Sequence, residues 1–161
     1  MRMGHPWHEI RHLEKEAGLV ALSANFALYG DMSDRMASLV AALGHRHEVY
    51  SIDESFVDLG GIPGDMTERA HAIRARVLQW VGIPCGVGIA PTKTLAKLAN
   101  HVAKTAERKP GSYPAALAQV CNLAQLPREE LDAVLEATEV GEVWGVGRKI
   151  AAQLKDAGIE T

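Results

Sequence analysis

Residues 49–59 read VYSIDESFVDL, and they place two adjacent carboxylates, Asp53 and Glu54, inside an otherwise apolar strand pattern. Neighbouring residues of a strand point to opposite faces, so these two side chains share a ligand only where the chain bends beside them. The stretch therefore predicts strand structure over residues 48–59, with a hairpin bend at Asp53 and Glu54. The sequence GGIPG at residues 60–64 predicts a loop after it.

Two carboxylates that converge at a strand end suit Mg²⁺, a hard cation that prefers oxygen ligands. A pair of such ions stabilises both the attacking and the leaving oxygen in phosphoryl transfer, and a third carboxylate is normally required. The same spacing also fits an ordinary tight turn between two strands, where acidic residues are common. Asp58, further along, is expected to be a solvent-facing strand end.

Outward from this hairpin, the middle of the chain is expected to run strand, helix, strand, helix. The expected elements are a short helix at 6–17, a strand at 20–22, an amphipathic helix from 25 to 44, a helix at 67–80, a strand at 85–90 and a helix at 93–108. From residue 114 onward the pattern predicts short helices only.

The expected helix at 93–108 has a basic face, formed by Lys93, Lys97, Lys104 and Arg108. At about 100° per residue these four side chains lie within about 60° of one another, while the apolar residues gather opposite them. We call this face the basic rail. It favours phosphate binding, although a merely solvated helix face fits the same pattern.

The segment VWGVGRK at residues 143–149 predicts a turn between two helices. Glycines at such a turn let backbone N–H groups approach a phosphate at the start of the second helix, and two basic side chains follow them. This arrangement is similar to the helix-hairpin-helix motif, which holds the DNA backbone without reading its sequence. A simple glycine-capped turn is the alternative. The candidate residues are Gly145, Val146, Gly147, Arg148 and Lys149.

Length and composition limit the number of domains and the classes of partner that the chain can have. The 161 residues suffice for one ordinary domain or two small lobes, and the net charge of −3 indicates no class of partner. Cys85 and Cys121 are far apart and lack a CxxC companion, which favours small buried apolar residues in a reducing cytosol. Neither a membrane span nor a signal peptide is expected, so we expect a cytoplasmic protein.

Three other motifs in the chain are weaker. His8 and His12 satisfy the H-E-x-x-H zinc pattern on an expected helix, so a zinc hydrolase stays open as a minor hypothesis. The run GVGIAP at 86–91 has proline where a dinucleotide fingerprint needs its third glycine. The run PTKT at 91–94 lacks the glycine and the register of a phosphate loop.

Three stretches together, YSIDESF at 50–56, GVGIAPTKTLAKLAN at 86–100 and VWGVG at 143–147, resemble the Y-family DNA polymerases, and among them the UmuC type. Residues 25–35 add to the likeness. The resemblance implies an α+β fold: a partial palm, with a mixed or antiparallel sheet and packed helices, plus part of the fingers and a helical thumb with a helix-hairpin-helix. The implied divisions are fingers and connection at 1–47, palm at 48–108 and thumb at 109–161.

The resemblance also implies an error-prone, DNA-directed DNA polymerase that performs translesion synthesis in SOS-type DNA repair. Asp53 and Glu54 would be catalytic ligands of two Mg²⁺ ions, Lys104 would contact the nucleotide triphosphate, with Lys97 as a weaker candidate, and residues 145–149 would hold the DNA backbone. The implied partners are damaged primer-template DNA, a deoxynucleoside triphosphate, a UmuD′-like dimer and a RecA-type filament. The protein would act in the cytoplasm, at the nucleoid.

The chain departs from this family at both ends. Family members begin earlier, with a strand that carries the first metal-binding Asp, and they continue into a little finger. We therefore expect a fragment that lacks one central strand of the palm sheet and has no polymerase activity alone. The alternative is a catalytically dead DNA-binding remnant, which Mg²⁺ or Mn²⁺ titration of the wild type and Asp53→Ala would distinguish.

Overall fold

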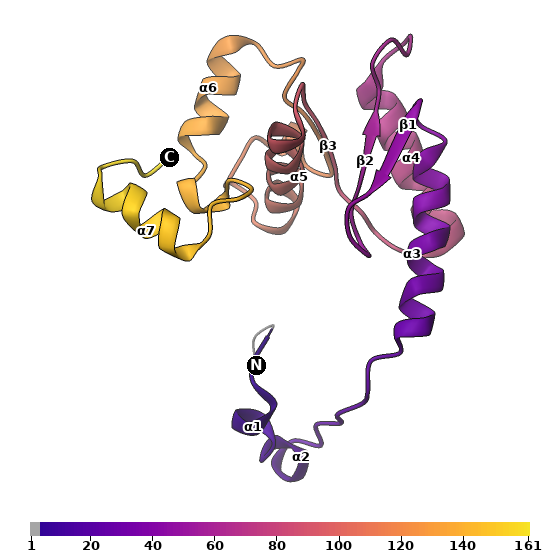
Figure 1. Cartoon of the computed structure of the whole chain (residues 1–161), viewed down its shortest axis with the longest axis vertical. Coiled ribbons are helices and arrows are strands. Elements are labelled where there is room, and N and C mark those ends of the chain that lie inside the picture. Colours follow the sequence, from indigo (N-terminus) through magenta and orange to yellow (C-terminus); the bar gives the residue numbers. More distant parts are fainter. Residues whose placement is uncertain (1–3) are drawn as a thin grey trace.

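Four short strands form two separate pairs in the computed structural model of this chain, which describes residues 4–161 (Figure 1). In chain order the elements are α1 (Trp7–Ile10), α2 (Leu13–Glu16), α3 (Phe26–Ala41), β1 (Arg46–Val49), β2 (Ser55–Asp58), α4 (Met66–Val81), β3 (Val87–Ile89), α5 (Lys93–Arg108), the 3₁₀ turn η1 (Ala115–Leu117), β4 (Val120–Asn122), α6 (Arg128–Glu136), the 3₁₀ turn η2 (Val140–Glu142) and α7 (Arg148–Asp156).

The predicted hairpin and the α+β class are both confirmed. Strands β1 and β2 pair antiparallel, with Glu48 opposite Phe56 and Val49 opposite Ser55. The strand expected at 85–90 is β3, but it does not join this hairpin. It pairs in parallel with β4, with Gly88 opposite Cys121. The sheet expected as one unit therefore consists of two halves in the described part of the chain.

Strand β4 corrects the expectation that residues after 114 form only helices. Its three residues, Val120, Cys121 and Asn122, are all buried. A three-residue strand is too short to show a period of two in the sequence. It forms because it hydrogen-bonds to β3 and packs against α5 and α4, which no local pattern reveals.

The predicted helices in the middle of the chain are confirmed. Capping interactions explain where they begin and end. α4 begins after Asp65, whose carboxylate accepts backbone hydrogen bonds from Thr67 at 2.7 Å and Glu68 at 3.3 Å. It ends at Gly82, which adopts a left-handed conformation with φ 76°. α5 spans Lys93–Arg108, the predicted bounds, and the Thr92 hydroxyl caps its start.

The core lies where the apolar face of α5 packs on β3 and β4. Gly88 makes this close approach possible, because a Cβ there would lie 2.2 Å from the backbone nitrogen of Asn100. Helices α3 and α4 pack against each other, and α3 also contacts the β1–β2 hairpin. The central core cluster consists of Ala99, Val102, Ala103, Leu117, Cys121, Leu123 and Val134.

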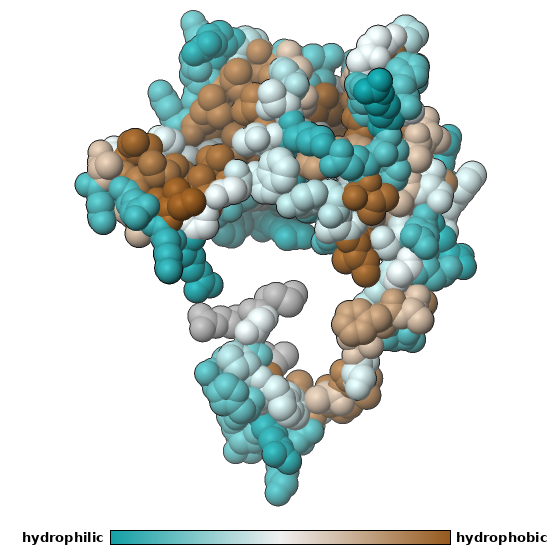
Figure 2. Space-filling model, viewed as in Figure 1, coloured by the Kyte–Doolittle hydropathy of each residue, from teal (hydrophilic) through white to brown (hydrophobic). Residues whose placement is uncertain are grey.

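The N-terminal segment differs most from the sequence-based expectation. The helix expected at 6–17 is two single turns, α1 and α2, and the strand expected at 20–22 does not form. Val20 and Leu22 are 73% and 87% exposed, and Figure 2 shows apolar atoms along the extended segment that joins α2 to α3. Three apolar residues do not specify a strand when none of the described strands pairs with them.

Within residues 4–161, no helix is both long and apolar enough to cross a bilayer.

Candidate functional site

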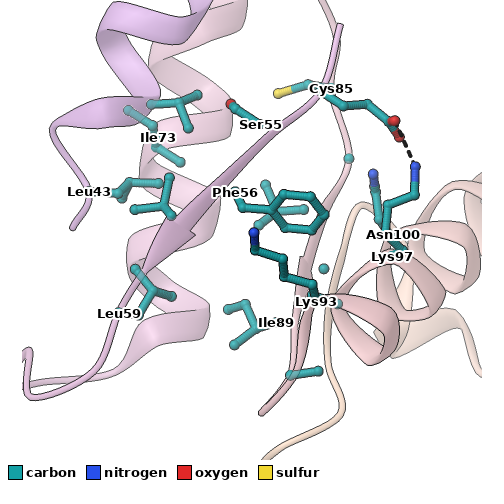
Figure 3. Close-up of a pocket in the computed structure, with 18 of the residues that line it drawn as sticks. Leu43, Ser55, Phe56, Leu59, Ile73, Cys85, Ile89, Lys93, Lys97 and Asn100 are labelled. Carbon is teal, nitrogen blue, oxygen red and sulfur yellow. Dashed lines mark hydrogen bonds and ion pairs between the residues drawn. The ribbon is translucent and has the colours of Figure 1, made fainter. Parts of the chain in front are cut away.

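A cleft of about 1330 Å³ separates the β1–β2 hairpin from β3 and α5. Figure 3 shows apolar side chains along it, among them Leu43, Phe56, Ile73 and Ile89, with Lys93, Lys97 and Asn100 directed toward it from α5. All residues of β2 and β3 line it, and within the described residues each of these strands pairs only on its other side. The cleft therefore combines an apolar wall with polar groups from two elements far apart in the sequence.

The predicted bend is a tight turn at residues 50–54, between β1 and β2. The backbone N–H groups of Tyr50 and Ser51 both donate to the carbonyl of Glu54 at 3.0 Å. The Ser51 hydroxyl donates to the Asp53 carboxylate at 2.7 Å. Asp53 is exposed and Glu54 partly buried, and both line the cleft. The turn and the paired carboxylates, which the sequence leaves as alternatives, are thus both present.

Glu54 already has a positively charged neighbour. The Nζ of Lys97 lies 2.7 Å from Glu54 Oε2, and about a quarter of each side chain is exposed. One helical turn earlier, Lys93 Nζ lies 2.5 Å from Glu48 Oε2 on β1, where both side chains are at least half exposed. The basic rail keeps its predicted face, but two of its four cations, Lys93 and Lys97, are paired with carboxylates. Their partners come from the hairpin, which helical spacing does not reveal.

The other half of the basic rail is free of such partners. Lys104 and Arg108 line the cleft, and neither forms an ion pair with any residue from 4 to 161. Lys104 lies against Gly86, where a Cβ would be 3.0 Å from its Cγ. The cleft is thus lined both by the adjacent carboxylates Asp53 and Glu54 and by the unpaired cations Lys104 and Arg108, groups suited to a metal ion and an anionic ligand.

Two further polar side chains, Asn100 and Cys85, line the cleft near Lys104. Asn100 Oδ1 is buried and has no hydrogen-bond partner among the described residues. The half-buried thiol of Cys85 has a raised pKa, because burial outweighs the opposite effect of Arg74 and Lys104. The Arg74 guanidinium also donates to the carbonyl of Cys85 at 2.8 Å and lies 3.3 Å from Glu107, which fixes the chain just before β3.

An aromatic cluster joins the carboxylate hairpin to the segment before α7. The rings of Tyr50, Phe56 and Trp144 are neighbours, with centroid distances of 5.4–5.9 Å. Trp144 Nε1 donates to the Tyr50 hydroxyl at 3.2 Å. No pattern in the sequence predicted this cluster. The available signal was composition, since the chain has only three Trp, three Tyr and two Phe, and two of these lie within the VYSIDESFVDL stretch.

The predicted turn at residues 145–147 directly precedes α7. Gly145 has φ 95°, a conformation that favours glycine, and Gly147 is the N-cap of α7. Val146 donates its N–H to the carbonyl of Val143 at 2.9 Å and closes the turn. Arg148 and Lys149 are exposed in the first turn of the helix. The five predicted residues therefore form one surface at a helix N-terminus, where backbone N–H groups favour an anion.

The zinc hypothesis does not fit the structure. α1 ends at Ile10, so His8 and His12 are not on one helix, and each lies beside a glutamate, Glu9 and Glu16 respectively. No group of three or more potential metal ligands from His, Cys, Asp and Glu occurs in the described part of the chain.

Asp53 and Glu54 are a set of two carboxylates with hard oxygen donors. Such a set fits Mg²⁺ when phosphates and water complete the coordination shell of the ion.

Comparison with known proteins identifies relatives for almost all of the chain. The model of the impB/mucB/samB family matches residues 1–101, and the IMS family HHH motif matches residues 128–159. Protein UmuC from Salmonella typhimurium is 40% identical over 160 residues, which are 98% of this chain and 36% of that protein. DNA polymerase IV 2 from Mesorhizobium japonicum is 34% identical over 164 residues, 100% of this chain and 35% of that protein.

The fold also matches solved structures. The insertion ternary complex of Dbh DNA polymerase has a TM-score of 0.75 and 24% identity, over 100% of this chain and 43% of that one. A DinB family error-prone DNA polymerase from Sulfolobus solfataricus gives a TM-score of 0.73 over 100% of this chain and 44% of that one. The expected polymerase-like fold is thereby confirmed. The chain spans little more than a third of the length of the curated relatives it matches.

Proposed function

Since the chain belongs to the impB/mucB/samB family, we propose that it is part of an error-prone, DNA-directed DNA polymerase that performs translesion synthesis in SOS-type DNA repair. The observation that carries the proposal is that one cleft is lined by both Asp53 and Glu54 and by Lys104 and Arg108. Nucleotidyl transfer needs a metal-binding acid pair and cations for a triphosphate within one site. A cleft with these groups supports that chemistry.

Asp53 and Glu54 are the proposed metal ligands, and Mg²⁺ is the proposed ion, with two ions in the complete enzyme. When bound, the ions supply charge stabilisation for the attacking and leaving oxygens. The tight turn at residues 50–54 directs both carboxylates into the cleft, and the Ser51 hydroxyl orients Asp53 through its 2.7 Å hydrogen bond. The Asp53 carboxylate is therefore held in place before a ligand arrives, whereas Glu54 has to exchange its contact with Lys97 for the metal.

Lys104 is the proposed contact for the triphosphate of the incoming nucleotide, with Lys97 as a second candidate. Lys104 lines the cleft without an ion-pair partner among the described residues, so its charge is available to a phosphate. Lys97 is engaged by Glu54 and becomes available only when that pair opens. The proposed divisions are fingers and connection at 1–47, palm at 48–108 and thumb at 109–161.

Residues 145–149 are the proposed contact to the DNA backbone. Glycine at positions 145 and 147 keeps the approach to the N-terminus of α7 open, and the exposed Arg148 and Lys149 add positive charge. The proposed partners are damaged primer-template DNA and a deoxynucleoside triphosphate. For the full-length protein we add a UmuD′-like dimer and a RecA-type filament, with action in the cytoplasm at the nucleoid.

Binding of Mn²⁺, followed by electron paramagnetic resonance, tests the metal site on which the proposal depends. We expect saturable binding by the 161-residue chain and a loss of at least about tenfold in affinity for Asp53→Asn, since one of two charged ligands is removed. Asp58→Asn is the matched control, because this exposed carboxylate lies at the opposite end of β2 and accepts from the N–H of Gly60. Equal affinities of wild type and Asp53→Asn would contradict the proposal.

A further inference from the structure

Lys97 has an unusual set of neighbours. Its ammonium group lies 2.7 Å from Glu54 Oε2, 5.3 Å from the centre of the Tyr50 ring and 5.9 Å from that of Trp144. An ammonium above an aromatic face is attracted to the ring, and more strongly where water is partly excluded. One cation on α5 therefore contacts both the carboxylate hairpin and the segment that leads into α7.

The three residues that surround the Lys97 ammonium also contact one another. Trp144 Nε1 donates to the Tyr50 hydroxyl at 3.2 Å, which holds the two rings around the ammonium. Tyr50 donates its backbone N–H to the carbonyl of Glu54, so the ring and the carboxylate belong to the same tight turn. A displacement of Lys97 therefore alters the contacts of Glu54, Tyr50 and Trp144 together.

Lys93 provides an internal comparison. It pairs with Glu48 and lies 5.2 Å from the centre of the Phe56 ring, so the chemistry is similar. Both of its ion-pair side chains are at least half exposed, whereas those of Lys97 and Glu54 are about one quarter exposed. Exposed pairs contribute little and break easily. Only the Lys97 pair includes a proposed metal ligand.

We propose that Lys97 is a displaceable positioning residue: it holds Glu54 while no metal is bound, and a divalent cation at Asp53 and Glu54 releases it from Glu54 and from the ring of Trp144. The proposal rests on the proposed metal site and adds a link to the DNA-binding turn. A divalent cation takes the carboxylate oxygen that Lys97 now contacts and repels the ammonium. Because Trp144 directly precedes Gly145, metal binding at the hairpin and phosphate binding at residues 145–147 become thermodynamically coupled.

The emission of Trp144 gives a readout that is independent of enzymatic activity. Replacing the exposed Trp7 and Trp80 by Phe leaves Trp144 as the sole tryptophan. In this background, Mg²⁺ is expected to cause a saturable change in Trp144 emission, because the ammonium leaves the ring. Calorimetry on the same samples gives the dissociation constant for Mg²⁺.

Lys97→Met is expected to bind Mg²⁺ about tenfold more tightly, since the competing charge is gone, and to lose the Mg²⁺-dependent change in emission. Lys97→Arg is expected to restore both properties toward wild type because it keeps the charge, and it excludes a fold defect as the cause. Lys93→Met, the matched control one turn earlier, is expected to leave the affinity and the emission change unaltered.

The outcomes separate this proposal from the metal site itself. If Asp53→Asn weakens Mg²⁺ binding but Lys97→Met binds Mg²⁺ as wild type does, the metal site stands and the role of Lys97 is overturned. An emission change that persists in Lys97→Met also overturns it. If neither the wild type nor any variant binds Mg²⁺, both proposals fail together.

Discussion

Trp144 donates its indole N–H to the hydroxyl of Tyr50, at 3.2 Å, and so joins two residues that are 94 positions apart in the chain. The bond connects the turn that carries Asp53 and Glu54 with the turn that precedes α7. The rings also meet nearly perpendicular, with centroids 5.4 Å apart, an arrangement favoured by their charge distribution. The turn that carries the proposed metal ligands and the segment that leads into the proposed DNA-binding turn are therefore in direct contact.

A double-mutant cycle measures this contact. Tyr50→Phe and Trp144→Phe each remove one partner of the hydrogen bond and keep an aromatic ring. We expect each to lower the free energy of unfolding, and the coupling energy to be about 0.5–1 kcal/mol, because Tyr50 remains partly hydrated when unpaired. Urea denaturation checks this. Losses that add to within about 0.3 kcal/mol would show that the bond contributes nothing.

Gly88→Ala tests the close approach of α5 to β3. The added Cβ would lie 2.2 Å from the backbone nitrogen of Asn100 and 2.3 Å from the carbonyl oxygen of Ala96. Backbone atoms cannot move aside as a flexible side chain does, so the helix must shift. We expect a loss of about 3 kcal/mol or more in the free energy of unfolding, measured by urea denaturation.

Gly30→Ala is the matched control for this substitution. Gly30 lies within α3, and a Cβ there would meet nothing within 4 Å. Alanine favours a helix interior over glycine, so the same change is expected to stabilise the chain by about 0.5–1 kcal/mol. Similar losses at positions 30 and 88 would contradict the packing argument.

Cys121 predicts a specific dependence of stability on alkaline pH. The thiol is fully buried, and burial raises its pKa from the usual 9.0 to about 12. The unfolded chain therefore releases this proton first, so stability is fully present below pH 9 and falls as pH rises from about 9 to about 12. The expected slope from this group is about −1.4 kcal/mol per pH unit. Cys121→Ala should lose that contribution, as measured by urea denaturation at several pH values.

Local signals explain which parts of the fold were predictable. α5 has a strong period of 3.6, a capping threonine and a proline-glycine break after its end, and its predicted bounds agree with the structure. The hairpin bend was predictable because two carboxylates interrupt an apolar strand pattern. In contrast, Val20 and Leu22 had the composition of a strand but no strand to pair with in the described chain, and they are exposed.

The features that the sequence did not predict depend on contacts between segments that are far apart in the chain. β4 is identifiable only through its pairing with β3, some 30 residues earlier. The partners of Lys93 and Lys97 come from a hairpin more than 40 residues away, so helical spacing suggested a free basic surface where ion pairs exist. The aromatic cluster of the site, which includes Trp144, has the same origin. The residue types in the sequence therefore indicated which chemical groups the site contains. Which of its charged side chains are paired with one another could be seen only in the folded structure.

The turn before α7 yields a prediction about DNA. Arg148 and Lys149 are exposed, lie in the first turn of α7 and form no ion pair within residues 4–161. Their contact with the phosphate backbone should be independent of sequence and sensitive to salt, because each contact releases counterions. Arg148→Ala and Lys149→Ala are expected to weaken binding to duplexes of different sequence by similar factors and to reduce the salt slope by about one each. Fluorescence anisotropy over a series of salt concentrations measures both quantities.

Lys155→Ala is the matched control, since it removes the same charge from the far end of α7, where Lys155 is paired with Glu139 at 2.9 Å. If Lys155→Ala weakens binding and lowers the salt slope as much as the other two, the binding follows net charge and the turn has no specific role.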